Sequence, residues 1–149
     1  MKGLAISLPS TKAIEMISKA LTSISNSKGL SLQGSKFSLP AMQAICSMLT
    51  CNNIIAALNL KDCHIDDDLI CCLAKGLNSN NTITDLFLEG NSISDRGVVC
   101  VVDMLKINNT LQQVDLLDNP IGLRGQLALK TIEELLIRSL ESTTKNSTT

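Results

Sequence analysis

The chain repeats itself with a period of 28 residues, and this period constrains its fold more than any other feature of the sequence. The register holds from Leu30 to Leu129 without an insertion or a deletion. Four columns show the agreement: Leu30, Leu58, Leu86 and Val114; Leu32, Leu60, Leu88 and Leu116; Phe37, Ile65, Ile93 and Ile121; Asn52, Asn80 and Asn108. Self-similarity at a fixed period indicates a solenoid, in which each unit buries its apolar face against its neighbours. We therefore expect the function to reside on a surface rather than in a pocket.

Each unit is predicted to contain a short strand, a turn and a helix. Apolar and polar residues alternate over 83–89, which is typical of a strand with Leu86 and Leu88 pointing inward. A column of good helix N-cap residues follows, namely Ser38, Asp66, Ser94 and Gly122. An apolar stripe with helical spacing comes next, as in 69–77. Strands joined through helices in this way should be parallel, with right-handed crossovers.

The predicted fold is therefore an α/β solenoid. Because a helix is wider than a strand, about 10 Å against 4.8 Å, the stack should curve, with parallel strands on the concave face and helices on the convex face. Residues 27–123 are predicted to form the core repeats, and residues 1–26 a degenerate N-terminal capping repeat. Residues 124–140 are predicted to form a C-terminal capping helix, and residues 141–149 a polar, disordered tail.

The pattern Leu-x-x-Leu-x-Leu-x-x-Asn/Cys-x-Ile/Leu, present at 55–65 and 83–93, resembles the signature of leucine-rich repeats. The 28-residue length with a full helix resembles the ribonuclease-inhibitor-like subtype, which also occurs in NOD-like receptors, Ran GTPase-activating proteins and tropomodulins. The resemblance covers residues 27–129 and implies a horseshoe-shaped, intracellular protein-binding module. The chain lacks the cysteine-flanked caps of secreted leucine-rich repeats, which also favours an intracellular location.

The six cysteines are expected to be free thiols in a reducing, cytoplasmic compartment. They are Cys46, Cys51, Cys63, Cys71, Cys72 and Cys100. Cys72 and Cys100 share a column with alanines, which indicates small buried side chains, and Cys63 shares a column with Asn91 and Asn119. Because an asparagine amide can pair with the open backbone groups of a turn, Cys63, Asn91 and Asn119 are predicted to form a structural ladder.

No catalytic residue, metal site or cofactor is predicted. The chain has one histidine, no glycine-rich nucleotide motif and no phosphate loop. Cys63, His64 and Cys72 should point in diverging directions, which argues against zinc. The carboxylates of 66–68 stand in the first turn of a helix, where they favour the helix dipole, and they lack the spacing of a calcium loop. A net charge of −1 argues against nucleic acid and acidic membranes as partners, and no segment reaches the roughly 18 apolar residues of a membrane span.

The outward-facing positions of the predicted strands are the candidate binding surface. The candidate protein-binding residues on the concave face are Lys61, Asp85, Phe87, Glu89, Asp115 and Leu117. Phe87 is one of two phenylalanines in a chain without Trp or Tyr, and an aromatic anchor with charged surroundings is typical of an interaction hot spot. A single exposed phenylalanine is also ordinary on a protein surface, so this alternative stays open. The carboxylates should create a negative field around Phe87 and Leu117.

The sequence thus predicts a non-enzymatic intracellular module that binds another protein through its concave face. The negative field predicts a partner with a basic segment that carries an apolar anchor. One alternative is a GTPase-activating protein of the leucine-rich type, which would need functional loops at the strand ends, where the register shows no insertions. Another is a structural or assembly solenoid whose open ends stack on another domain or copy. A pathogen effector that imitates host machinery would show the same pattern.

Overall fold

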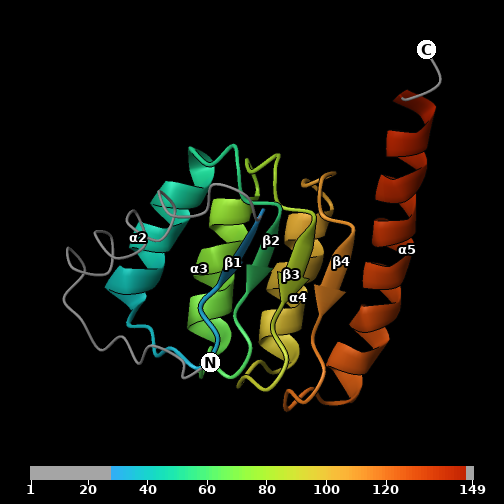
Figure 1. Cartoon of the computed structure of the whole chain (residues 1–149). Helices are drawn as coiled ribbons and strands as arrows, with labels where there is room; N and C mark the ends of the chain where they lie inside the picture. Colours follow the sequence, from blue (N-terminus) through green and yellow to red (C-terminus); the bar gives the residue numbers. More distant parts are fainter. Residues whose placement is uncertain (1–27, 147–149) are drawn as a thin grey trace.

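The structure is a computed structural model that describes residues 28–146, in which four strands alternate with four helices (Figure 1). The strands are β1 (Gly29–Ser31), β2 (Ala57–Asn59), β3 (Asp85–Phe87) and β4 (Gln113–Asp115). The helices are α2 (Leu39–Thr50), α3 (Asp67–Leu77), α4 (Asp95–Leu105) and α5 (Leu123–Asn146). The predicted alternation of strand and helix is confirmed. The predicted capping repeat at 1–26 lies outside the described residues.

The strands form one parallel sheet in the order β1-β2-β3-β4. Its register reproduces the 28-residue period, because Leu30, Leu58, Leu86 and Val114 are Cα partners across the sheet. The helices α2, α3 and α4 lie behind the sheet, and α5 stands beside β4 at the end of the row (Figure 1). Each strand therefore has one face toward the helices and one face turned away from them.

An aliphatic core fills the space between sheet and helices. The inward residues Leu58, Leu60, Leu86 and Leu88 are fully buried, and Leu73 of α3 meets them from the helix side. The helices begin where the N-cap column predicts. The side chains of Ser38, Asp66 and Ser94 accept hydrogen bonds from the backbone N–H groups of Ala41, Leu69 and Arg96, respectively. Each cap satisfies a donor that the first helical turn leaves open.

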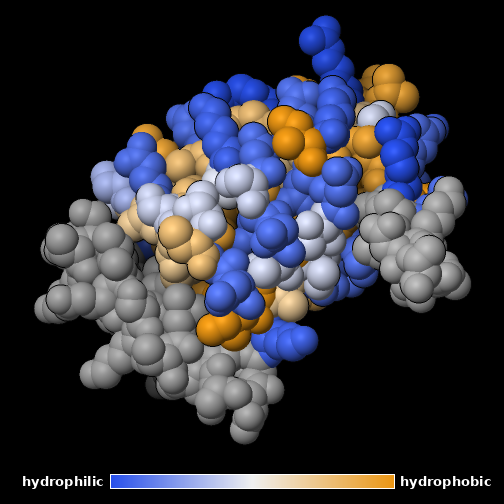
Figure 2. Space-filling view, turned by 90° about the horizontal axis from the view of Figure 1, so that it is seen from above, coloured by the Kyte–Doolittle hydropathy of each residue, from blue (hydrophilic) through white to orange (hydrophobic). Residues whose placement is uncertain are grey.

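The last helix is longer than predicted. α5 begins at Leu123 and continues to Asn146, past residue 140 and into the segment expected to be disordered. Its C-terminal end projects beyond the other elements (Figure 1). Within the described residues, no helix combines the length and the apolar character that crossing a membrane requires. Seen from above, the surface is largely hydrophilic, with hydrophobic side chains in separate clusters (Figure 2).

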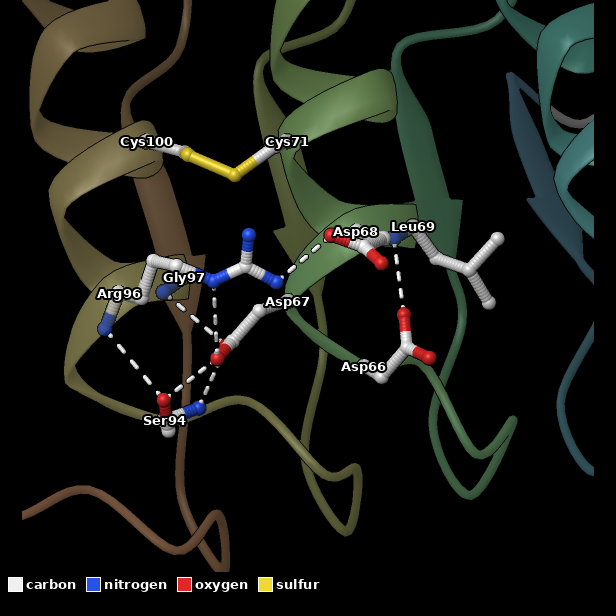
Figure 3. The surroundings of a disulfide bond; sticks show 9 residues. All are labelled: Asp66, Asp67, Asp68, Leu69, Cys71, Ser94, Arg96, Gly97 and Cys100. Carbon is white, nitrogen blue, oxygen red and sulfur yellow. Dashed lines mark hydrogen bonds and ion pairs between the residues drawn. A yellow bond between two sulfur atoms is a disulfide. The ribbon is translucent and has the colours of Figure 1, made fainter.

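The prediction of six free thiols is wrong, because Cys71 and Cys100 form a disulfide between α3 and α4 (Figure 3). Their Cα atoms are 5.2 Å apart and their sequence separation is 29 residues, one more than the repeat. In the alignment of the repeats, Cys100 shares a column with Cys72. In the structure, Cys71 rather than Cys72 points toward the next helix. The cysteines that remain free in the described residues are Cys46, Cys51, Cys63 and Cys72.

Candidate functional site

The surface of the sheet that is turned away from the helices carries the candidate binding residues. We call it the strand face and define it by the outward residues of the strands and the residue two positions after the end of each strand. It includes Lys61, Asp85, Phe87, Glu89, Asp115 and Leu117. The parallel register brings Phe87 beside Asp115, because these residues are Cα partners on β3 and β4. The 28-residue step places Lys61 beside Glu89.

Lys61 is the centre of a charged cluster on the strand face. Its ammonium group donates a hydrogen bond to Glu89 Oε2 and lies 3.4 Å from Asp115 Oδ2. The same Nζ lies 5.6 Å from the centroid of the Phe87 ring, which is within the range of a cation–π contact. The hydrogen bond to Glu89 raises the pKa of Lys61 above its ordinary value, with Asp115 adding to it. Lys61 is therefore charged throughout the physiological pH range.

This cluster changes the expected electrostatics of the strand face. The sequence predicts a negative field around Phe87, but the structure places a cation over the ring and between two of the three carboxylates. The third carboxylate, Asp85, accepts a hydrogen bond from the Thr84 hydroxyl at 2.6 Å. A ligand that contacts Phe87 on the strand face would therefore lie close to the Lys61 ammonium group.

Phe87 and Leu117 differ in their exposure. Phe87 is partly buried under Lys61, whereas 68% of Leu117 is exposed. Leu117 also lines a groove between β4 and α5, together with the apolar side chains of Leu129 and Leu136 and the carboxylate of Glu133. The apolar part of the strand face thus extends from Phe87 toward the open edge of the sheet.

The turn after each strand is held by the ladder residues. Asn91 is buried, its Oδ1 accepts from the N–H groups of Cys63 and Ile65 at 3.0 and 2.9 Å, and its Nδ2 donates to the carbonyl oxygens of Leu60 and Leu88 at 2.9 and 2.7 Å. The Asn91 amide group therefore bonds both to its own repeat and to the previous one.

The other two ladder positions make fewer such bonds. Asn119 accepts from Ile93 N at 3.0 Å and donates to Leu88 O at 2.9 Å. Cys63 donates from Sγ to Leu32 O at 3.1 Å, which follows the same geometry with a weaker donor. Burial raises the pKa of the Cys63 thiol, so the sulfur stays protonated and keeps its donor.

A second asparagine ladder lies at the opposite ends of the strands. Asn80 and Asn108 are buried, and they donate to the carbonyl oxygens of Leu49 and Leu77 in the previous repeats, each at 2.7 Å. The column Asn52, Asn80 and Asn108 was visible in the sequence. Its role as a bridge between repeats was not predicted, because an asparagine in a turn has many local uses.

The sequence also does not predict the carboxylate cluster that lies between α3 and α4. Asp67 accepts hydrogen bonds from the backbone N–H groups of Ser94 and Gly97 at 2.8 and 3.0 Å and from the Ser94 hydroxyl at 2.5 Å (Figure 3). Arg96 completes the cluster through Asp68, 2.6 Å from its Nη2. Asp67 therefore connects two helix N-termini, whereas the sequence predicts a role only within its own helix.

The charge state of Asp67 follows from these contacts. Burial would raise the pKa of this carboxyl group, but the hydrogen bonds from Ser94 and Gly97 outweigh burial, and the Arg96 charge acts in the same direction. The pKa of Asp67 is therefore below its ordinary value. A side chain at position 97 would collide with this carboxylate, since a Cβ there would lie 2.5 Å from Asp67 Oδ1.

The next question is whether the described residues could bind a metal ion or supply a reactive thiol. In residues 28–146, no group of three or more His, Cys, Asp or Glu side chains is placed to hold a metal ion. Cys46 and Cys72 have their Sγ atoms 3.8 Å apart. Burial, with Cys72 adding to it, raises the pKa of Cys46 to about 12, which makes this thiol a poor nucleophile. The strand face remains the candidate functional site.

Comparisons with known proteins agree with the fold. No protein-family model matches the chain, and no curated protein matches its sequence. A solved structure described as "Leiomodin-1 Actin-Binding Site 2 (ABS2)" is similar, with a TM-score of 0.66 and 18% sequence identity over 94% of this chain and 95% of that chain. At this identity the likeness shows the fold alone. The chain therefore has a leucine-rich-repeat-like α/β fold with a parallel sheet.

Proposed function

We propose that the chain is a non-enzymatic module that binds another protein on its strand face. In this proposal the repeats belong to the ribonuclease-inhibitor-like subtype and form a horseshoe whose concave surface is the strand face. The proposal is supported by the general fold and by a similar structure that is described as an actin-binding site. Actin is therefore one specific partner to test.

The observation that carries the proposal is the cluster of Lys61, Phe87, Glu89 and Asp115. It combines the one aromatic ring of the strand face with groups of both charges that already contact each other. Hot spots combine an aromatic anchor with polar groups that are desolvated on binding. A core-packing role does not explain Phe87, because the ring lies on the side of the sheet that is turned away from the helices.

The cluster also specifies the chemistry of the partner. An arginine or lysine of the partner can replace Lys61 at Glu89 and Asp115, and the displaced Lys61 then uncovers the Phe87 ring. An apolar group next to this cation would contact Phe87 and Leu117. The proposed partner is therefore a basic segment with an apolar anchor, as the sequence predicts, but its binding requires Lys61 to move.

The test is capture of partners with the wild-type chain and with Phe87→Ala, followed by binding measurements on each captured protein. Phe87→Ala should weaken binding by about 2 kcal/mol or more. The matched control is Val99→Ala, which removes an exposed apolar side chain from the helix side and should leave binding unchanged. Cosedimentation with actin filaments tests the one named candidate. Equal binding by wild type and Phe87→Ala for every captured partner would refute the strand face as the site.

Charge variants separate this proposal from its alternatives. Asp115→Asn should slow association mainly at low salt, because screening removes the effect of a rim charge. A GTPase-activating protein would instead stimulate GTP hydrolysis by a small GTPase, which an assay with and without the chain detects. An assembly role for the solenoid would appear as self-association together with no foreign partner captured on the strand face.

We also propose an intracellular, cytoplasmic location, which the resemblance to leucine-rich repeats implies. The disulfide between Cys71 and Cys100 stands against it, since disulfides persist mainly in oxidising compartments. Alkylation of thiols at the moment of cell lysis decides the question. A cytoplasmic protein should show Cys71 and Cys100 alkylated, and a protein from an oxidising compartment should show them protected.

A further inference from the structure

The outer side of α5 carries an apolar and charged stripe that nothing in the described part of the chain covers. Its members are Leu123, Leu127, Lys130, Glu134 and Ile137, separated by alternating steps of four and three residues. This spacing keeps side chains on one helix face and is the seam pattern of a coiled coil. The exposed fractions of the three apolar residues are 84%, 68% and 57% in chain order, so the stripe faces solvent.

The stripe continues the surface through which the earlier helices contact their next neighbours. Shifted back by two repeats, Leu123, Leu127 and Lys130 correspond to Asp67, Cys71 and Ala74 of α3. Two of these α3 residues bond directly to the following repeat, Asp67 through Ser94 and Cys71 through Cys100, and Ala74 is buried. On α3 this surface is therefore covered by a helix.

The opposite side of α5 packs against the rest of the molecule. Gly125 and Ile132 are buried there, and Gly125 approaches Asp95 so closely that a Cβ would lie 2.5 Å from its Oδ1. Apolar side chains on a helix face are normally covered by a neighbouring element. α5 has apolar residues on both sides, which indicates that a further helix covers the stripe.

We infer that this helix is α5 of a second copy of the chain, packed antiparallel about a two-fold axis. With the axis between Lys130 and Glu134, Leu127 of one copy faces Ile137 of the other. Lys130 of each copy then faces Glu134 of the other, so two ion pairs form at the centre. A two-fold interface uses the same patch twice, and the part of the stripe from Leu127 to Ile137 is complementary to itself in the antiparallel direction.

The charge order selects this arrangement. A parallel pairing would place Lys130 opposite Lys130 and Glu134 opposite Glu134, and like charges across a helix seam disfavour the pairing. In the described residues, neither Lys130 nor Glu134 has an ion pair within its own chain. Both are therefore available to a second copy without breaking an existing contact.

The interface sets the expected strength of the dimer. A helix of 24 residues is about 36 Å long, and one helix pair of this length buries less than the roughly 1,200–2,000 Å² of a stable specific interface. We therefore expect a reversible dimer whose population rises with protein concentration. The interface lies on α5, apart from the Lys61 and Phe87 cluster, so it is independent of the proposed function.

Sedimentation velocity over a concentration series tests the inference on the full chain. The background carries Cys51→Ser, because Cys51 is exposed and could cross-link two copies. The parent chain should pass from a monomer of 16.0 kDa to a dimer of twice that mass. Lys130→Glu and Glu134→Lys should each lose the dimer at concentrations where the parent is half dimeric. Circular dichroism verifies that both variants are folded.

Mixing the two variants gives the decisive result. In an equimolar mixture, a Lys130→Glu chain meets a Glu134→Lys chain with opposite charges at both central contacts, so the dimer should return. The control Lys75→Glu makes the same charge change on the exposed side of α3 and should dimerise like the parent. A parent that stays monomeric at every concentration, a mixture that stays monomeric, or assembly into open oligomers would overturn the inference.

Discussion

Asn91 is buried in the turn after β3 because its amide group replaces backbone partners that an irregular turn lacks. It accepts two backbone hydrogen bonds from the previous repeat and donates to one carbonyl oxygen on each side of the repeat boundary. Its neighbours lose these partners together when the amide is removed. The cost of such a change is the desolvation of unpaired buried groups rather than the loss of one average hydrogen bond.

Asn91→Ala should therefore lower the free energy of unfolding by about 1–3 kcal/mol. Chemical denaturation in urea measures the change. The matched control is Asn109→Ala, because Asn109 is an exposed asparagine of the turn before β4 and should tolerate the change. Equal midpoints for Asn91→Ala and the wild type would show that the ladder contributes nothing to stability.

The protonation state of the Asp67 carboxyl group affects the stability of the folded chain. Its pKa in the folded chain is lowered, so the folded state prefers the charged carboxylate more than the unfolded state does. The resulting stabilisation is complete above the unfolded pKa of about 4 and is lost as the pH falls through the folded pKa. The loss follows from protonation of an acceptor that serves Ser94 and Gly97.

Asp67→Asn should accordingly be less stable than wild type at pH 7, and the difference should shrink as the pH falls below about 4. Urea denaturation at several pH values gives both curves. Asp68→Asn removes a nearby carboxylate that is 70% exposed and should change the pH dependence little. Parallel curves for wild type and Asp67→Asn would contradict the assigned role.

At the scale of elements, the sequence predicts what every repeat shares. The strand register follows from the 28-residue period, since Leu58 pairs with Leu86 as the alignment places them, and the helix starts follow from the N-cap column. Contacts that occur once are not predicted. Lys61 and Glu89 share a column, so their proximity was accessible, but the cation over Phe87 depends on side-chain direction. The Cys71–Cys100 bond joins different columns, which an alignment by columns does not compare.

The disulfide links α3 to α4, and its contribution to the free energy of unfolding can be measured. Closing a loop of 29 residues should stabilise the chain by roughly 3–4 kcal/mol in the chain-entropy model. The double variant Cys71→Ser/Cys100→Ser should lose about this amount in urea. Thiol counting under denaturing, non-reducing conditions should find four free thiols in the wild type. Cys51→Ser, which changes an exposed free thiol, is the control. A count of six would mean that the bond is absent.

At the scale of the whole molecule, stability depends on contacts between neighbours. The helix contacts connect α2 with α3, α3 with α4 and α4 with α5, and the strand pairs follow the same order. In such a stack the total stability is close to a sum of unit terms and interface terms. The inner repeats have two interfaces each. In the part of the chain that the structure describes, α5 packs on one helix, α4, and its C-terminal end extends beyond the sheet (Figure 1).

Native-state amide exchange should therefore vary along the stack when measured where the chain is monomeric. Amides of β2, β3 and α3 should exchange slowest, and amides of α5 beyond Leu136 should exchange fastest among the helices, because local opening there breaks no inner interface.

Asp95 Oδ1 accepts a hydrogen bond from Gly122 N at 2.6 Å and links α5 to α4. Asp95→Ala should thus accelerate exchange in α5 with little change in β2. Asp67→Ala, which cuts the same type of contact in the middle of the stack, should accelerate exchange in both α3 and α4. Uniform exchange in both variants would mean that the chain opens only as one cooperative unit.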